Sequence, residues 1–587
     1  YDANAMLSQI SDGNGRALTL TYNSGGRVAF IQDQTGRIWQ YGYNPDGTLK
    51  TVTNPLNGVR SYEYKAYQPV GDGNVYRQLT KITDASGLVV TQVTYVGERV
   101  TSYTEGANTY NYAYNLTTKT VTKTDSLNSV WRFTYNADGI VTEDVDPLNN
   151  KTTTVYDADG NIIQRVDPLG KIWQSTYDSS GRKLTAADPL GNSVTFAYTG
   201  SNPNPSQVTS PSGRITKIVY DAKLNPVSAT DPANAVTQFQ WSAQGDLIAT
   251  TDAAGQSSAI TYTPVGLPAT ATDPLNRVSS YAYDTRGNLI AQTNAAGETH
   301  QFVYDALDRL VQSVDALGQT TGLAYDAAGR LLSVTDPAGK ITAFAYDLYG
   351  RPIKRTSPDG RVWTTTYRAD NLQSQVTLPD TRTLTYSYDA AKRLTSENAA
   401  GQTTMFTYSA RDELLSATGP GGSITRTYDA LGRLLTETNN GQTVTLAYNV
   451  DSERTQMTAL GVPTSYTYDT RGLLTGISRA GQAFTFANDV LGRRSQLNLP
   501  NGVASQYGYD AASQLTQIAH TGPFATTYGY GHDAAGRITQ LTGDGANWNY
   551  QYDTLSRLTQ ATHGADVSSY AYDPVGNLLN NNRQHDS

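Results

Sequence analysis

Short apolar runs alternate with turn signals along this chain, and the stretch 325–346 shows the pattern most clearly. Its sequence, YDAAGRLLSVTDPAGKITAFAY, holds two strand-length runs at 331–335 and 341–346. The segment 326–329 fits a type I turn, because Asp favours the first position of such a turn and Gly the fourth. The segment 336–339 fits a second turn, with its proline where the fixed φ of that residue belongs. The pattern predicts two antiparallel strands and two tight turns in each unit.

The same unit returns at a fixed spacing along the whole sequence. Its aligned aromatic position recurs mostly every 21 residues as far as Tyr388 and mostly every 20 residues beyond it. The 28 aligned positions are Tyr1, Tyr22, Tyr43, Tyr64, Tyr95, Tyr114, Tyr135, Tyr156, Tyr177, Tyr198, Tyr220, Trp241, Tyr262, Tyr283, Tyr304, Tyr325, Tyr346, Tyr367, Tyr388, Tyr408, Tyr428, Tyr448, Tyr468, Asn488, Tyr509, Tyr530, Tyr552 and Tyr572. A fixed period of this size indicates a repeat architecture.

This periodicity also bounds the domain organisation. A length of 587 residues would ordinarily suggest about four domains. Repeat proteins instead grow by adding units, so we predict one repeat array over residues 1–587, with no separate second domain. The array has about 28 repeats of 20–21 residues and an irregular insertion near residues 65–80. Because both termini carry the repeat's own signature, we expect the chain to be a fragment of a longer one.

The predicted fold is all-β: tandem antiparallel hairpins that form one long sheet. Asn-Gly, the favoured two-residue hairpin turn, replaces the longer Asp-Pro-x-Gly turn at 439–441, so a repeat can lose one loop residue without changing its strands. Two strands per repeat, about 4.8 Å apart, give a ribbon roughly 270 Å long. Open sheets of more than ~10 strands curl or split. Since aliphatic residues are too few to fill its inside, we expect the ribbon to coil as a spiral into a hollow cage.

Two other folds share this period. A parallel β-helix has coils of similar length but needs stacked aliphatic side chains inside, whereas the aligned position here is tyrosine. A β-propeller blade could be built from two repeats, but 28 repeats would give 14 blades, well above the usual 4–8.

Aromatic residues often occur in the pattern aromatic-x-aromatic-Asp, as at Phe344/Tyr346 and Tyr386/Tyr388. Residues i and i+2 of a strand point to the same face of the sheet. We therefore expect rings from successive repeats to form ladders along that face, with cross-strand aromatic pairs contributing roughly 0.2–1 kcal/mol each.

Composition narrows the function classes. Lys and Arg number 44 against 52 Asp and Glu, a net charge of −8 with no basic stripe, so nucleic acid is not an expected ligand. No apolar run approaches the length of a membrane span, and no signal-peptide pattern is present, so we expect no direct membrane insertion by this segment. There are no cysteines, which excludes disulfides and thiolate metal sites.

Candidate catalytic and metal-binding motifs are weak. The five histidines, His300, His520, His532, His563 and His585, are scattered without metal-ligand spacing. The glycine-rich segment 419–422 is predicted to be a turn rather than a phosphate loop. Residues 157–160, Asp-Ala-Asp-Gly, resemble the start of a calcium loop but lack its further ligands, so we predict a plain turn. We expect no cofactor, no metal and no enzymatic activity.

The repeated motif Tyr-Asp-x-x-Gly-Arg-Leu with Asp-Pro-x-Gly between copies resembles the YD repeats of Rhs proteins, and the resemblance covers the whole chain. The residues that carry this structural signature are Tyr325, Asp326, Gly329, Arg330, Asp336, Pro337, Gly339, Tyr346, Tyr428, Asp429, Gly432 and Arg433. The resemblance implies a spiral β-cage of the kind found in type VI-secreted polymorphic toxins, in the C components of Tc toxins and in teneurins.

In bacterial members of that family, a region after the repeats plugs the cage and releases a C-terminal toxin by aspartyl-type autoproteolysis. Its Asp-Pro-x-Gly-Leu-x-Gly-Gly-like motif is absent here, so no protease residues are assigned. The resemblance implies a toxin cargo of the same polypeptide as partner, together with N- and C-terminal plug domains and secretion machinery. The implied location is cytoplasmic before export, then secreted or delivered by a bacterial secretion system.

Three functional hypotheses remain. The first is an encapsulating shell that sequesters the toxin until delivery. The alternative is a cell-surface module that binds carbohydrate or partner proteins through exposed aromatic residues, as a teneurin-like adhesion protein would. The third, autoproteolysis, would require residues beyond this segment.

Overall fold

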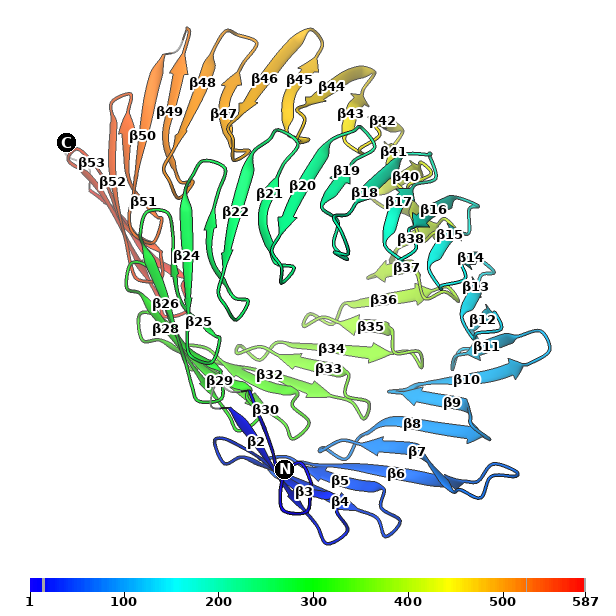
Figure 1. Cartoon of the computed structure of the whole chain (residues 1–587). Coiled ribbons are helices and arrows are strands. Elements are labelled where there is room, and N and C mark those ends of the chain that lie inside the picture. Colours follow the sequence, from blue (N-terminus) through cyan, green and yellow to red (C-terminus); the bar gives the residue numbers. More distant parts are fainter. Residues whose placement is uncertain (13–15, 524, 585–587) are drawn as a thin grey trace.

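The computed structural model describes residues 1–12, 16–523 and 525–584, and all regular structure in these ranges is β-strand (Figure 1). Fifty-five strands form one sheet, in which each strand pairs antiparallel with the next strand along the chain. The first and last strands each pair on one side only, so the sheet is not closed. The all-β meander is confirmed, and consecutive antiparallel pairing excludes a parallel β-helix.

The strands of the first part of the ribbon are β1 (Gln9–Ser11), β2 (Ala17–Tyr22), β3 (Val28–Asp33), β4 (Ile38–Tyr43), β5 (Leu49–Thr53), β6 (Val59–Tyr67), β7 (Tyr76–Thr83), β8 (Val89–Val96), β9 (Arg99–Glu105), β10 (Asn108–Asn115), β11 (Thr120–Thr124), β12 (Val130–Tyr135), β13 (Val141–Val145), β14 (Lys151–Tyr156), β15 (Ile162–Val166), β16 (Ile172–Tyr177), β17 (Lys183–Ala187), β18 (Ser193–Ala197), β19 (Gln207–Thr209) and β20 (Ile215–Tyr220). The middle strands are β21 (Pro226–Thr230), β22 (Val236–Trp241), β23 (Leu247–Thr251), β24 (Ser257–Tyr262), β25 (Pro268–Thr272), β26 (Val278–Tyr283), β27 (Leu289–Thr293), β28 (Thr299–Tyr304), β29 (Leu310–Val314), β30 (Thr320–Tyr325), β31 (Leu331–Thr335), β32 (Ile341–Tyr346), β33 (Pro352–Thr356), β34 (Val362–Tyr367), β35 (Gln373–Thr377), β36 (Thr383–Tyr388) and β37 (Leu394–Ala399). The last strands are β38 (Gln402–Tyr408), β39 (Leu414–Gly419), β40 (Gly422–Tyr428), β41 (Leu434–Asn439), β42 (Gln442–Tyr448), β43 (Arg454–Ala459), β44 (Val462–Tyr468), β45 (Leu474–Arg479), β46 (Gln482–Asn488), β47 (Arg494–Asn498), β48 (Ala504–Tyr509), β49 (Leu515–Thr521), β50 (Thr526–His532), β51 (Ile538–Gly543), β52 (Ala546–Tyr552), β53 (Leu558–His563), β54 (Asp566–Tyr572) and β55 (Leu578–Gln584).

Each repeat contains two kinds of turn, which lie at opposite ends of the strands. The turn that follows the anchor tyrosine, such as 326–330, joins an even-numbered strand to the next odd one, and we call it the signature turn. The turn in the middle of the repeat, such as 336–340, joins an odd strand to the next even one, and we call it the link turn. Strands β31 and β32 cover the two ranges that the sequence pattern predicts.

Both turns of this repeat share one hydrogen-bonded form. In the signature turn, Gly329 N–H donates to the Asp326 carbonyl and Asp326 N–H donates to the Arg330 carbonyl, which closes a three-residue hairpin loop. Gly329 has a φ of +88°, the left-handed conformation that such loops need at their last residue. In the link turn, Gly339 has a φ of +75° and makes the equivalent bond to Asp336. The predicted turns are confirmed.

The signature hairpin also carries a β-bulge. Ala324 lies opposite Ser333, but Tyr325 lies opposite Leu331, so β31 has one extra residue between them. The same shift in register recurs at nearly every signature hairpin, for example at Tyr346 and Tyr428. A bulge increases local twist and bends the strand. Its repetition at every second strand is therefore one cause of the ribbon's coiling.

The shortened repeats have a different link turn, as the Asn-Gly signal predicts. Asn439 pairs directly with Gln442, and the two loop residues Asn440 and Gly441 have φ values of 48° and 83°. Two consecutive positive φ values define a type I′ turn, which is the favoured two-residue hairpin connection. The segment 419–422 is likewise a two-residue turn between β39 and β40.

The ribbon coils through about two turns of a spiral (Figure 1). Within the described ranges, strands contact only their neighbours along the chain. The two coils instead meet through their turns, where residues 237 to 282 positions apart in sequence form hydrogen bonds and ion pairs. Each contact joins a link turn of one coil to a signature turn of the coil that follows it. At each contact we call the coil that supplies the link turn the first coil, and the coil that supplies the signature turn the second coil. We call this line of contact the seam.

The wall of the spiral is one sheet thick. Its surface is 31853 Å², whereas a compact protein of 63.4 kDa would expose roughly 20,000 Å². Among the described residues, only Val93, Val145, Val503 and Ala561 are buried hydrophobic residues. A wall with both faces exposed accounts for the excess surface and for the lack of a central core. The expected hollow spiral is confirmed.

Candidate functional surface: the repeat wall and its seam

The anchor tyrosine ties neighbouring strands together through its hydroxyl group. Tyr346 at the end of β32 donates to the carbonyl of Leu331 at the start of β31, and Tyr428 donates to Leu414, both at 2.8 Å. The equivalent bond, to a carbonyl 14 to 16 residues earlier, forms at Tyr22, Tyr43, Tyr95, Tyr114, Tyr156, Tyr177, Tyr198, Tyr220, Tyr262, Tyr325, Tyr367, Tyr408, Tyr448, Tyr468, Tyr509, Tyr552 and Tyr572. The acceptor lies at the bulge, where the ladder is locally disrupted.

The two other residue types at this position preserve the bond. Trp241 donates its indole N–H to the carbonyl of Pro226 at 2.8 Å, and the Asn488 amide donates to Leu474 at 3.4 Å. The position therefore requires a donor at the tip of a side chain, and an aromatic ring is the usual way to place it.

The expectation of continuous aromatic ladders is wrong. Among the described residues, ring–ring contacts are confined to His520–Tyr528, Trp548–Tyr550 and Trp548–His563. Successive anchors lie on every second strand, about 10 Å apart, which is beyond the 4.5–7 Å of a ring pair. Arginine fills the gap: the guanidinium of Arg330 lies 5.1 Å from the Tyr346 ring centre, and that of Arg433 lies 4.7 Å from Tyr448. The ladder thus alternates tyrosine with arginine.

The Asp and Arg of the signature form a compact ion pair within their turn. Asp326 Oδ1 accepts hydrogen bonds from the backbone N–H groups of Ala328 and Arg330, each at 2.9 Å. Its Oδ2 accepts one from Arg330 Nε at 2.6 Å. Burial alone would raise the pKa of Asp326, but the hydrogen bonds and charge of Arg330 outweigh it and lower the pKa. The Asp326 carboxylate therefore favours its ionised form and fixes the turn at three points.

The remaining signature residues occupy the same two turns. Asp336 Oδ1 accepts from the backbone N–H groups of Ala338 and Lys340, and Pro337 and Gly339 complete that link turn. The second copy is built alike. Asp429 pairs with Arg433 at 2.7 Å, and Gly432 has a φ of 80°. Nine of the twelve residues therefore shape or staple turns, and the three tyrosines tie neighbouring strands together.

Arginine also connects one repeat to the next. Arg309 donates to the carbonyl of Asp326 in the following signature turn at 3.0 Å while it pairs with its own Asp305. The bidentate geometry and ring stacking of arginine suit this double role better than the point charge of lysine. The sequence motif shows the arginine, but its reach into the next repeat is visible only in the structure.

The seam is a set of side-chain contacts that the sequence analysis did not foresee. Across it, Arg214 on the first coil pairs with Glu453 on the second, and Arg537 on the second pairs with Glu298 at 2.7 Å. The hydrogen bond from Arg214 is the main cause that lowers the pKa of Glu453. Further seam contacts join Gln34 to Thr285, Arg37 to Asp308, Asn371 to Glu105 and Ala107, Lys392 to Asp125, Arg411 to Asp167, and Arg277 to Gln514.

Six of the ten buried polar residues in the described ranges belong to this line. They are each at most 9% exposed and lie in or beside link turns of the first coil: Asp33, Asn108, Asp125, Ser129, Asp167 and Glu298. Turns at the edge of a free ribbon would be solvated, so their burial is a consequence of the second coil resting on them. A buried carboxylate needs a partner charge. The opposite coil supplies this charge to Asp125, Asp167 and Glu298, whereas Asp33 pairs with Arg37 of its own turn.

One seam contact has the form of a box. Lys392 inserts its ammonium between the rings of Tyr110 and Trp131, 5.4 Å and 5.6 Å from their centres. Its Nζ lies 3.5 Å from Oδ2 of Asp125, whose side chain is fully buried. Lys123 covers the same two rings at 4.0 Å and 5.2 Å.

Lys392 departs from the repeat signature. It occupies the turn position that is Gly329 or Gly432 in other copies, and its φ is 71°. A left-handed conformation costs a residue with a Cβ roughly 1–2 kcal/mol, and only Asn and Asp tolerate it readily. The sequence could have shown this signal, because YDAAKR stands where YDAAGR is the rule.

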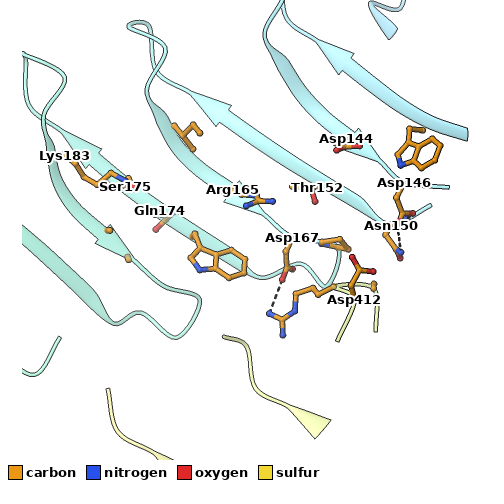
Figure 2. Close-up of a pocket in the computed structure, with 18 residues that line it drawn as sticks. Asp144, Asp146, Asn150, Thr152, Arg165, Asp167, Gln174, Ser175, Lys183 and Asp412 are labelled. Atoms are coloured by element: carbon orange, nitrogen blue, oxygen red, sulfur yellow. Dashed lines mark hydrogen bonds and ion pairs between the residues drawn. The ribbon is translucent and has the colours of Figure 1, made fainter. Parts of the chain in front are cut away.

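A pocket of about 670 Å³ opens beside the seam (Figure 2). Strands β12 to β17 supply most of its lining, and residues 410–412 of the second coil border it. Figure 2 shows Asp144 and Arg165 on neighbouring hairpins; no hydrogen bond or ion pair engages either side chain in the described structure. Arg165 lies opposite Trp173 in the ladder. Burial, with a smaller contribution from nearby Asp146, raises the pKa of Asp144.

The other described residues considered as possible metal ligands in the sequence take part in turn and strand hydrogen bonds. Asp157 Oδ1 accepts from the backbone of Asp159 and Asn161, so residues 157–160 are the predicted turn. His520 bonds to Ser505 at 2.8 Å and His563 to the Gly545 carbonyl at 3.0 Å, while His585 lies outside the described residues. Within 1–12, 16–523 and 525–584, no three His, Asp or Glu side chains form a group suited to a metal ion.

The insertion near residues 65–80 is an elongated hairpin. Strands β6 and β7 continue past the usual turn, with Tyr67 opposite Tyr76, and enclose the exposed loop 68–75. It extends from a signature turn of the first coil, away from the seam. No helix long and apolar enough to span a bilayer occurs in the described ranges.

The sequence matches known family profiles, and the fold matches known structures. The profile of the teneurin YD-shell matches residues 89–274 and 256–419, and that of the RHS repeat matches 408–445. The Photorhabdus luminescens Tc holotoxin pore matches with a TM-score of 0.54 and 15% identity over 96% of this chain and 35% of that chain. The TcdB2-TccC3-Cdc42 complex matches with a TM-score of 0.51 and 14% identity, covering 97% of this chain and 39% of that chain.

This chain therefore spans little more than a third of the length of these solved chains, and at such identities the likeness concerns the fold. No curated relative matches the sequence. The two teneurin YD-shell matches together cover residues 89–419, more than half of the 587 residues. The repeat motif, the coiled one-layer sheet and this match agree: the chain belongs to the teneurin YD-shell family.

Proposed function

We propose that this chain is the encapsulating wall of a toxin-delivery protein. It encloses a toxin domain C-terminal to it in the same polypeptide until a secretion system delivers the assembly. The observation that carries this proposal is the one-layer spiral wall, which exposes roughly 1.6 times the surface of a compact protein of its mass. An enclosure needs this geometry, whereas an enzyme or a rod does not.

The proposed mechanism is steric. A continuous hydrogen-bonded ladder blocks passage between strands, and the seam blocks passage between coils. The wall itself needs no cofactor and no catalytic residue, so we assign it no enzymatic activity. Plug domains on either side of this segment would close the ends, and secretion machinery would carry the assembly from the cytoplasm to its target. The net charge of −8 gives no reason to expect nucleic acid as a partner.

The comparisons support the toxin connection only through the relatives. Solved structures with the same fold include Tc toxin assemblies, one of them a complex named for TcdB2, TccC3 and Cdc42. Membership of the teneurin YD-shell family is compatible with the shell and with the adhesion alternative.

The decisive experiment uses the full-length parent protein. A cryo-electron microscopy map should show the two-coil wall with additional density inside it. Limited proteolysis of the same sample should leave the C-terminal domain intact until the wall is unfolded. An empty interior, with a C-terminal domain that is digested as fast as a free one, would reject encapsulation.

A second candidate is recognition of a carbohydrate or a partner protein by the pocket beside the seam. The uncommitted Asp144 and Arg165 beside Trp173 favour it, because sugar rings bind to an aromatic face flanked by charged groups. Titration of this chain with neutral oligosaccharides should then change its tryptophan fluorescence, and Trp173→Ala should abolish the change. A fluorescence signal that survives Trp173→Ala would reject this site.

A further inference from the structure

Seven signature turns of the second coil have a side chain where the turn itself favours glycine, and three of these side chains contact the first coil. The three are Asp308, Asn371 and Lys392, with φ values of 60°, 69° and 71°. The other four, Asp412, Ser452, Ser513 and Ser556, contact an arginine of the preceding repeat in their own coil. The same position is glycine in many other signature turns, including Gly329 and Gly432. Asp and Asn tolerate this conformation, but lysine is rarely found in it. A strained residue that persists in a regular repeat indicates a role outside its own turn.

Each of the three side chains reaches across the seam. Asp308 Oδ2 accepts from Arg37 Nη1 at 2.7 Å. Asn371 accepts a hydrogen bond from the Ala107 backbone N–H at 3.1 Å and donates one to the Glu105 carbonyl at 2.9 Å. Its side chain therefore binds both a donor and an acceptor of the same first-coil link turn.

Lys392 makes the most demanding of these contacts. Asp125 Oδ1 is used by its own link turn, accepting from Leu127 and Ser129 N–H at 2.9 Å each. Its Oδ2 accepts no hydrogen bond, and its side chain is fully buried, so the Lys392 ammonium at 3.5 Å is the charge that faces it across the seam. Tyr110 and Trp131 form the walls of the box, and the ammonium groups of Lys392 and Lys123 both lie 4.0 to 5.6 Å from their ring centres.

We propose that Asp308, Asn371 and Lys392 are the register keys of the seam: they determine which first-coil turn each second-coil turn meets. The backbone hydrogen bonds between strands cannot fix the register between the two coils, because they are the same in every repeat. The three partners on the first coil, Arg37, the 105–107 turn and Asp125, are chemically unlike one another. A second coil shifted by one repeat would place each key against the wrong partner.

Lys392→Gly separates this role from a merely local one. Glycine is the residue the turn prefers, so the turn itself should become more favourable, while the seam loses its cation opposite Asp125. Leu224→Gly is the matched control: Leu224 holds the same turn position with a φ of 67°, on a first-coil signature turn away from the seam. Lys392→Met keeps a side chain and the strained backbone but removes the charge, which tests the electrostatic part alone.

Two readouts report on the seam. In Lys392→Gly, hydrogen exchange of the amides in the link turn 125–129 should accelerate by roughly tenfold, because this turn loses its contact with the second coil and opens locally more often. Exchange of the β31 and β32 amides, which lie away from this contact, should not change. The absence of cysteine allows spin labels at Leu127→Cys and Ala390→Cys, on either side of the seam. Their distance distribution should broaden in Lys392→Gly and Lys392→Met.

The control variant should leave both readouts as in the unsubstituted chain. If Lys392→Gly behaves like Leu224→Gly, with unchanged exchange and a narrow distance distribution, lysine at this position is incidental and the proposal is wrong. Should Lys392→Gly fail to fold, the comparison of Lys392→Met with the unsubstituted chain decides the question by the same two measurements.

Discussion

Tyr346 donates its hydroxyl hydrogen to the backbone carbonyl of Leu331 across 2.8 Å, and so ties the last residue of one strand to the first residue of its neighbour. The acceptor belongs to a bulge, where the regular ladder leaves carbonyl groups poorly paired. Tyrosine, tryptophan and asparagine all make this bond in different repeats. The hydroxyl tip of the tyrosine, rather than its ring, explains its abundance.

Removing this tip should therefore weaken one repeat. Tyr346→Phe keeps the ring and its stacking on Arg330 but leaves the Leu331 carbonyl without its donor. We expect a loss of about 0.5–1.5 kcal/mol of local stability, the usual net value of one such bond. Hydrogen exchange of the β31 and β32 amides measures it. Tyr349→Phe is the control, because Tyr349 lies in the next signature turn and is 48% exposed; equal effects of the two changes would contradict the assignment.

The arginine between two anchors should not be replaceable by lysine. Arg309→Lys loses the Nε bond to Asp305, the bond to the Asp326 carbonyl and the stacking on Tyr325 at 4.8 Å. We expect a cost of about 1–2 kcal/mol, since one point charge cannot replace a planar fork. Thermal unfolding monitored by circular dichroism is the measurement.

Arg361→Lys provides the comparison for that change. Its side chain is 64% exposed and pairs with Asp359, itself 52% exposed. An exposed pair contributes about 0–1 kcal/mol, so this substitution should be nearly silent. If it destabilised the chain as much as Arg309→Lys, arginine would matter here through general charge rather than through its position between repeats.

Glycine is required in the signature turn for its backbone alone. A Cβ added at Gly329 would meet no atom closer than Arg309 Nη1 at 3.9 Å, so space is available, but the φ of +88° is unfavourable for alanine. Gly329→Ala should cost about 1–2 kcal/mol. Gly322→Ala, in strand β30 where the new Cβ would meet Thr335 at an ordinary 3.7 Å, should be neutral or slightly stabilising. Unfolding curves of the two variants test the difference.

Acid should destabilise the wall through its turn carboxylates. Burial opposes the ionised form of Asp326, Asp347 and Asp429, but hydrogen bonds from the following arginine lower the pKa of each below its ordinary value. A lowered pKa in the folded state gives stability that is present above the unfolded pKa of about 3.9 and is lost as pH falls through the folded value. We expect the melting temperature to be level from about pH 7 to 5 and to fall steeply below about pH 4.

A single substitution tests the contribution of one turn to this pH dependence of the melting temperature. Asp326→Asn removes one ionisable group and should reduce the acid dependence while lowering stability at neutral pH. A melting temperature that already declines between neutral pH and about pH 5 would contradict the assignment, because the carboxylates of the turns remain ionised there.

The sequence was sufficient to predict the backbone elements that recur. The strands 331–335 and 341–346, both kinds of turn and the coiling of a long ribbon follow from local turn chemistry and strand twist, which act within a single repeat. The aromatic ladder was mispredicted because the distance between alternate strands was not taken into account. The Tyr346–Leu331 bond could not be foreseen, since it depends on where the bulge directs a carbonyl.

Contacts that do not recur in every repeat were harder to predict. The seam brings together residues about 240 to 280 positions apart, and its partners depend on the number of repeats in one coil, which no local pattern encodes. Lys392 is the exception, because a lysine at a glycine position breaks the repeat. Departures from a consensus are informative in repeat proteins for this reason.

The seam gives the whole assembly a polarity. It always sets link turns against signature turns, so the two free ends of the spiral cannot be alike. One end presents signature turns of the first coil, with the long hairpin at 65–80, and the other presents link turns of the second coil. A closure shaped for one end cannot seal the other. In the encapsulating role that we propose, loading and emptying would therefore have a direction, set by the order of two turns within a segment of about 21 residues.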